Sequence, residues 1–217
     1  MQAWLTRWGP LAGALSAAAF VASFITGSNT PDSDQTGAQV ISWYTAHHTS
    51  QILSNLFAGL AMALLVAFAV TLAGRVRRGE RWTAVGLVAG AVCLAVGLTA
   101  TLGFNLVLAL DTSHLTAASA QTLNLLQNDF FLPIVLGVVL FGILGGLAMV
   151  AGRMLPAAMG WVLFAVGAVA LVPPIAWFCL LGTMLWVLVA SIWLTVQKPP
   201  AVAHEAVAAS EQVPSLT

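Results

Sequence analysis

Charged side chains are scarce in this sequence. Only 6% of the 217 residues are Asp, Glu, Lys or Arg, and lysine occurs once. A soluble domain carries about 25% charged residues, so a soluble fold is excluded. Seven bases balance seven acids, which leaves no basic surface for a nucleic acid. Because 60% of the residues are hydrophobic, the chain is predicted to be an integral membrane protein.

Recognisable catalytic and cofactor motifs are also lacking. The sequence contains no Gly-rich phosphate loop, no G-x-S-x-G elbow, no C-x-x-C pair and no H-x-x-x-H metal spacing. Its two cysteines, Cys93 and Cys179, lie inside apolar runs, where a thiol behaves as a small hydrophobic group. We therefore expect no disulfide, no bound metal and no cofactor.

Six apolar runs are predicted to cross the membrane as helices. These predicted spans contain no Lys, Arg, Glu or His, which argues against a proton-coupled carrier, a voltage sensor and a haem protein. The first run exceeds the roughly 7 to 15 residues of a signal-peptide core and is read as a retained span. The predicted fold is an all-α, polytopic transmembrane bundle with six spans in three hairpins, at about residues 9–26, 51–73, 83–105, 130–151, 157–172 and 175–196.

The stretch Gly74–Trp82, GRVRRGERW, holds four of the seven basic residues and fixes the predicted orientation. With six spans, every basic residue falls on one side, which the positive-inside rule assigns to the cytoplasm together with both termini. The Ala- and Pro-rich tail 197–217 is expected to be disordered there. Six arginines to one lysine, with abundant Ala, Val, Leu and Gly, favour a bacterial plasma membrane. The basic residues are Arg7, Arg75, Arg77, Arg78, Arg81, Arg153 and Lys198.

Two polar stretches face the opposite, outer side, and each predicts a short amphipathic helix at the membrane surface. In residues 27–50, Thr36 and Gln39 have the spacing of a capping box. In residues 110–129, Asp111 is suited to cap the second helix. These helices carry most of the polar groups available for recognition.

The candidate site residues are Asp111, His114, Asp129 and His47, which all lie on the outer side. Asp111 and His114 stand three residues apart, so one helical turn would bring carboxylate and imidazole to the same face. The alternative is that the aspartates cap helices while the histidines lie at the level of the lipid headgroups. The remaining ionisable residues of the two outer stretches are Asp32, Asp34 and His48.

Several uncharged residues within or beside the spans also allow two interpretations. Asn55, Asn105 and Asn128 could hydrogen-bond between helices or contact a polar group of a ligand. Trp186, near the middle of the last span, needs a partner for its indole N–H or a cavity. Gly-x-x-x-Gly pairs predict close helix packing or a dimer face, and they occur at Gly9/Gly13, Gly86/Gly90 and Gly142/Gly146.

The residues Arg153-Met-Leu-Pro-Ala-Ala-Met-Gly-Trp161, followed by an apolar run, resemble a short inner turn of small multi-span bacterial membrane proteins. Those proteins belong to domain-of-unknown-function families that are frequent in actinobacteria. The resemblance covers the fourth and fifth predicted spans and implies no active-site residues.

We therefore expect a non-enzymatic accessory or interaction protein of the plasma membrane. Its partners would be lipid, another membrane protein or a second copy of the chain, and no nucleic acid. The alternative is a membrane-embedded enzyme or carrier for a lipophilic small molecule, with the polar end of that molecule held at the outer face by the candidate site residues.

Overall fold

The computed structural model describes residues 2–27, 29–75, 81–129, 131–152 and 155–196. Helices account for 87% of these residues and none of them lies in a strand, so the predicted all-α bundle is confirmed. The helices are α1 (Gln2–Thr26), α2 (Gly37–Ala73), α3 (Arg81–Leu110), α4 (Ala117–Asp129), α5 (Leu132–Gly152), α6 (Ala157–Val169) and α7 (Pro173–Val196).

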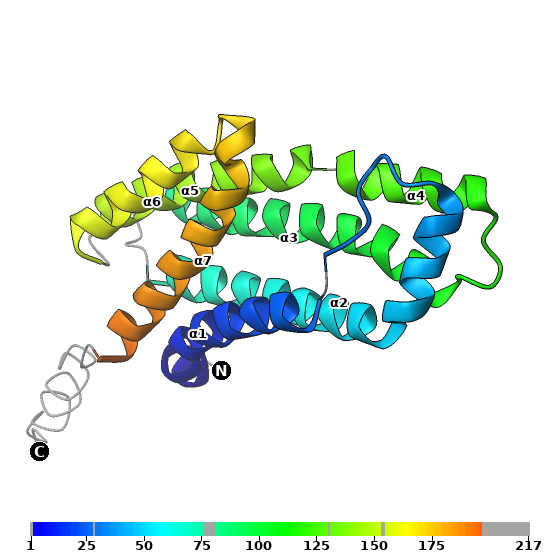
Figure 1. Cartoon of the computed structure of the whole chain (residues 1–217). Coiled ribbons are helices and arrows are strands. Elements are labelled where there is room, and N and C mark those ends of the chain that lie inside the picture. Colours follow the sequence, from blue (N-terminus) through cyan, green and yellow to red (C-terminus); the bar gives the residue numbers. More distant parts are fainter. Residues whose placement is uncertain (1, 28, 76–80, 130, 153–154, 197–217) are drawn as a thin grey trace, which may run out of the picture.

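The predicted capping box starts α2. The Thr36 backbone N–H donates to the Gln39 side-chain oxygen at 2.9 Å. The helix then runs for 37 residues with a kink at His47, where φ is −112° and ψ is 17°. The kink separates the first predicted outer helix, residues 37–46, from the segment that contains the second predicted span, and the two segments run in different directions (Figure 1). At 1.5 Å per residue, the 26 residues after the kink, 48–73, are about 39 Å long, enough for the roughly 30 Å of a hydrocarbon core.

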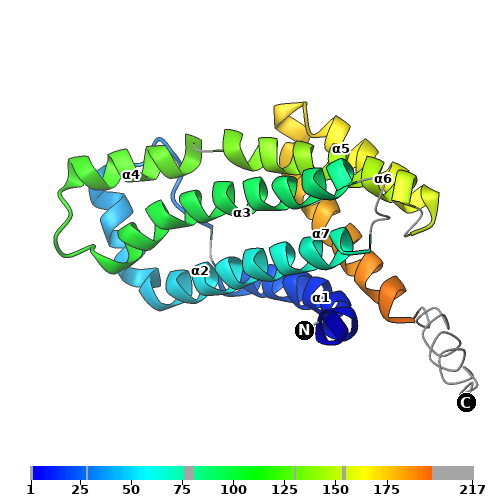
Figure 2. The same ribbon diagram turned by 180° about the vertical axis from the view of Figure 1, so that it is seen from behind.

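The helices that cross the bundle form a closed ring. In order around the ring, α1 packs against α2, α2 against α3, α3 against α5, α5 against α6, and α6 against α7, which returns to α1 (Figures 1 and 2). The helices thus make three hairpins, α1/α2, α3/α5 and α6/α7, and α4 lies in the chain between the two helices of the second hairpin. Inside the ring lies a continuous apolar core that includes Leu65, Phe68, Leu94, Phe141 and Leu180.

The Gly-x-x-x-Gly pairs serve packing within the chain. A Cβ atom at Gly142 would overlap the Cα of Gly167 on α6, and one at Gly146 would lie 2.6 Å from the carbonyl oxygen of Gly160. Here α5 and α6 touch backbone to backbone. The other two pairs also face neighbouring helices. Gly9, Gly13 and Gly86 lie against the side chains of Thr71, Ser191 and Leu144, and Gly90 lies against the backbone of Phe141.

Within the part of the chain that the structure describes, five helical segments are long and apolar enough to cross a membrane: Gly9–Thr26, Gly37–Ala73, Trp82–Leu110, Ala117–Gly152 and Ile175–Val196. These segments indicate a multi-pass membrane protein. The predicted span 157–172 corresponds to α6, which is apolar but has only 13 helical residues. Its length of about 20 Å falls short of a bilayer core.

The two ends of the bundle differ in character. At one end lie the start of α1, the end of α2, the start of α3 and the ends of α5 and α7 (Figures 1 and 2). Arg75 and Arg81 are at this end, at the end of α2 and the start of α3. Other charged residues assigned to this end fall outside the described residues. They are Arg77, Arg78 and Glu80 of the basic stretch, Arg153 after α5, and Lys198 in the predicted tail 197–217.

The opposite end carries a separate substructure, here called the cap: residues 29–36, the α2 segment 37–47, and α4. The cap contains the two predicted outer helices, and the structure shows that they pack around a small core of their own with the end of α3. Its buried members are Val40, Tyr44, Leu108, Ala109 and Ala120. In Figure 1 the cap lies on the right, with α4 nearly in line with α5.

Candidate functional site

Long-range hydrogen bonds from α4 hold the cap together. Asn124, which is fully buried, donates from Nδ2 to the carbonyl oxygen of Asp32 at 2.9 Å. Asn128 donates to the carbonyl oxygen of Pro31 at 3.3 Å. The hydroxyl of buried Tyr44 donates to the side-chain oxygen of Gln127 at 2.9 Å. The segment 29–36 and α2 are therefore both fixed to α4, and the outer surface of the cap is preorganised.

The predicted pair of Asp111 and His114 forms in the turn between α3 and α4. His114 Nδ1 lies 2.7 Å from Asp111 Oδ1, and the two side chains are 80% and 53% exposed, respectively. A side-chain contact this exposed adds little to stability, in general less than about 1 kcal/mol. With Nδ1 engaged by the carboxylate, Nε2 is the ring nitrogen left for proton transfer.

The other two candidate residues lie elsewhere in the cap. His47 stacks on Trp43 with ring centroids 4.4 Å apart, and its Nδ1 lies 2.8 Å from the Trp43 carbonyl oxygen. Asp129 is the exposed last residue of α4. The structure thus joins Asp111 to His114 and gives His47 a separate partner. Among the described residues, no three His, Cys, Asp or Glu side chains converge as a metal site would require.

An open groove of about 550 Å³ runs along the outer face of the cap. It combines amide and hydroxyl side chains with the stacked Trp43 and His47 rings, so it offers both hydrogen bonds and apolar contact to a partner. We call this the cap groove, and its lining residues are Gln35, Ala38, Gln39, Ser42, Trp43, Ala46 and His47.

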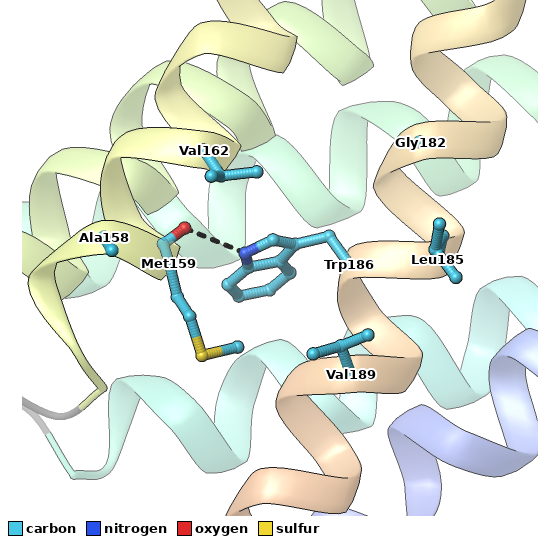
Figure 3. A pocket seen from close by; sticks show the side chains of 7 residues that line it. All are labelled: Ala158, Met159, Val162, Gly182, Leu185, Trp186 and Val189. Carbon is cyan, nitrogen blue, oxygen red and sulfur yellow. Dashed lines mark hydrogen bonds between the residues drawn. The ribbon is translucent and has the colours of Figure 1, made fainter.

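A second hollow, of about 300 Å³, lies between α6 and α7. Figure 3 shows the Trp186 ring reaching from α7 towards α6, where its indole N–H donates to the Met159 carbonyl oxygen at 2.9 Å. The predicted need of Trp186 for a partner is confirmed. The rest of the lining is apolar, so the hollow suits hydrocarbon: Ala158, Val162, Gly182, Leu185 and Val189.

Between the apolar core of the ring and the core of the cap lies a group of buried amides on α2 and α3. Gln51, Asn55 and Asn105, which we call the amide layer, are 2%, 7% and 8% exposed. Both amide atoms of Asn55 and the oxygen of Asn105 are buried without a hydrogen-bond partner. Each such group costs about 1 to 3 kcal/mol of stability.

Sequence analysis identified part of this arrangement. It singled out Asn55, Asn105 and Asn128, and the structure shows that Asn128 does bridge to another segment. It did not identify Asn124, whose partner lies 92 residues away in the chain. It did not identify the cap groove. The groove residues lie at positions 35, 38, 39, 42, 43, 46 and 47, which have the spacing of one face of a single helical segment. This helical spacing was the signal in the sequence that could have found them.

Fold and site together define an all-α, multi-pass membrane protein with a polar cap at one end. No protein-family model matches the chain, and no curated protein or solved structure shows significant similarity to it.

Proposed function

We propose that this is a non-enzymatic accessory or interaction protein of a bacterial plasma membrane, with the cap on the outer side and both termini in the cytoplasm. The cap groove carries the proposal. It is a preorganised surface at the end of the protein that the positive-inside rule places outside. Its amide, hydroxyl and aromatic side chains are typical of a protein-binding surface.

The expected partner is the extramembrane part of another membrane protein. The cap lies beyond the predicted spans, because its core includes Leu108 and Ala109 at the end of α3, past the predicted limit of that span at residue 105. The groove is therefore presented at the outer membrane surface. The ionisable groups of the cap also favour binding over chemistry, since Asp32, Asp34 and His48 are exposed and the pair of Asp111 and His114 is open to solvent.

Site-specific photo-crosslinking in cells tests this function. A benzophenone amino acid is placed at Ala38, Ser42 or Ala46, which are exposed residues of the cap groove. The control position is Val96 on α3, which is 63% exposed within a predicted span. We expect one discrete protein adduct from the groove positions and lipid adducts from Val96. The proposal fails if groove and control positions give the same products.

A second candidate function, a membrane enzyme or carrier, is favoured by one observation. The contact of Asp111 with His114 would leave an imidazole nitrogen free to act as a general base. Replacing His114 by Gln distinguishes the two functions. If the protein acts by interaction, the His114→Gln variant keeps its crosslinked adduct. If it is an enzyme or carrier that uses the pair, the variant fails to restore the growth or lipid phenotype of cells in which the gene is deleted.

A further inference from the structure

The amide layer groups three of the four buried amide side chains among the described residues. The fourth is Asn124 in the cap, and the other buried polar residues are Ser and Thr. On α2 and α3 the main core reaches outward to Ala61 and Leu98, and the cap core begins at Tyr44 and Leu108. The amide layer occupies the interval. Its members lie on the helix faces that are buried in the bundle, so water from the outer side does not reach them in this structure.

Packing alone does not account for these side chains. Asn128 shows what an amide does when it links segments here, because its Nδ2 donates to Pro31 and to Asn124 backbone oxygens. The oxygens of Asn105 and of Asn124 in the cap are buried without a partner, but the Asn124 Nδ2 still donates to a backbone oxygen. Asn55 differs from both, because both of its amide atoms are buried and neither makes a hydrogen bond, although the residue is only 7% exposed. A leucine of similar size would fill the same space without leaving polar atoms unpaired.

The surface of α2 leaves open space close to this layer. Gly59 lies one turn from Asn55 towards the other end of the bundle. Gly59 is partly exposed, and a Cβ atom built there would meet no heavy atom within 4 Å, whereas glycines at the α5/α6 contact meet backbone. The missing side chain therefore leaves a gap on the lipid-facing side of α2, one turn from Asn55, through which a ligand can approach.

We propose that the amide layer binds the headgroup of an uncharged amphiphile, a lipid or lipophilic molecule whose headgroup carries both hydrogen-bond donors and acceptors, such as hydroxyls. Asn55 offers an N–H donor and an oxygen acceptor, and Asn105 a second acceptor. The hydrocarbon part of the ligand lies in the membrane. This site is distinct from the cap groove and does not depend on the function proposed for it.

The composition of the layer sets the charge of the ligand. All three members are neutral amides, and the adjoining stretches of α2 and α3, residues 49–73 and 82–110, contain no Asp, Glu, Lys, Arg or His. A carboxylate or ammonium ion placed here would have no countercharge in a medium of low dielectric constant. Neutral hydroxyl and carbonyl groups can satisfy the amides without that cost.

The test uses the full chain in phosphatidylcholine nanodiscs and two photoactivatable probes with the same acyl chain. One probe is a monoacylglycerol with an uncharged diol headgroup, and the other is the corresponding fatty acid. We expect the monoacylglycerol to label peptides of α2 and α3 near Asn55 and Asn105, and to raise the melting temperature of the protein by mass action. The fatty acid should do neither.

Variants then assign the effect to the amides. Asn55→Leu should weaken monoacylglycerol binding about tenfold through the loss of its hydrogen bonds, while the probe-free protein melts at the same or a higher temperature. Asn105→Leu is a second, independent variant. Ser16→Ala is the control, since it removes a buried hydroxyl that is bonded to Ala61.

Three results would overturn the inference. The first is an absence of labelling in the unaltered protein. The second is equal labelling by the fatty acid. The third is undiminished binding in both leucine variants. A lower melting temperature of probe-free Asn55→Leu with unchanged binding would show instead that the amide has a structural partner.

Discussion

At the scale of single residues, buried hydroxyl and amide groups set the geometry of the cap. Tyr44 is fully buried, and its hydroxyl is the link from α2 to Gln127 on α4. A buried hydrogen bond of this kind contributes about 0.5 to 1.5 kcal/mol net, and the partner left behind loses its donor. The phenolic oxygen therefore adds a direct hydrogen bond between α2 and α4 to the apolar contacts of the cap core.

Tyr44→Phe is expected to destabilise the cap by about 1 kcal/mol without unfolding the bundle. Hydrogen–deuterium exchange of backbone amides should become faster in α4 and stay unchanged in α5. Thr45→Val is the matched control, because it removes a neighbouring hydroxyl that is bonded only within its own helix, to Ile41. Unchanged exchange in α4 would show that the phenolic hydrogen bond does not hold the cap.

Residue-level prediction from sequence succeeded where the partners are close in the chain. The capping box needed only the spacing of Thr36 and Gln39. For Trp186, chemistry predicted the need for a partner, but only the fold shows that Met159 supplies it. The bond from Asn124 to Asp32 had no local signal, since it arises when α4 and the segment 29–36 come together in space.

At the scale of helices, the glycines decide how closely α5 and α6 approach. Gly142 and Gly167 face each other with no side chain between the two backbones. Backbone contact of this kind contributes dispersion energy and is important in a membrane, where apolar lipid provides no hydrophobic drive for helices to associate. It also anchors α6, which is too short to be held by a full crossing of the bilayer.

Gly142→Ala is therefore expected to lower the stability of the bundle by about 1 to 3 kcal/mol, since the new methyl group overlaps backbone that cannot move aside. Thermal unfolding in detergent measures this change. Gly103→Ala is the matched control on α3, where a Cβ meets nothing within 4 Å, and it should be neutral or slightly stabilising. Equal effects of the two substitutions would contradict the packing role of Gly142.

The helix boundaries show where sequence patterns stop being informative. Polarity changes near residue 51 predicted a surface helix followed by a span, and the structure has a kink at His47 that separates two helical segments of α2. Hydropathy thus located this junction to within a few residues. By contrast, the apolar run 157–172 does not reveal that the helix ends at Val169.

At the scale of the whole molecule, the separation of cap and basic end predicts the orientation. In a variant with Cys93 and Cys179 replaced by alanine, a cysteine at the exposed Ser113 should react with a membrane-impermeant maleimide in intact cells. A cysteine at Arg77 should react only after the cells are opened, because positively charged loops stay in the cytoplasm. The reverse pattern would place the cap groove inside the cell.

The fold class followed from composition because a chain this apolar must satisfy its backbone hydrogen bonds within helices. The ring order of the helices did not follow, since α1 and α7 meet only after the whole chain has been placed. Of the amide layer, the sequence singled out Asn55 and Asn105 but not Gln51, and only the structure shows that neither amide atom of Asn55 has a partner.

The shortness of α6 has a consequence for the lipid around the protein. A helix of 13 residues leaves about 10 Å of hydrocarbon thickness unmatched, so the bilayer must be compressed into a dimple on that flank. Compression costs elastic free energy that falls when two dimples merge. Copies of this protein, or any neighbour with an equally short helix, would thus be drawn together flank to flank by the membrane itself, and most strongly where the bilayer is thick.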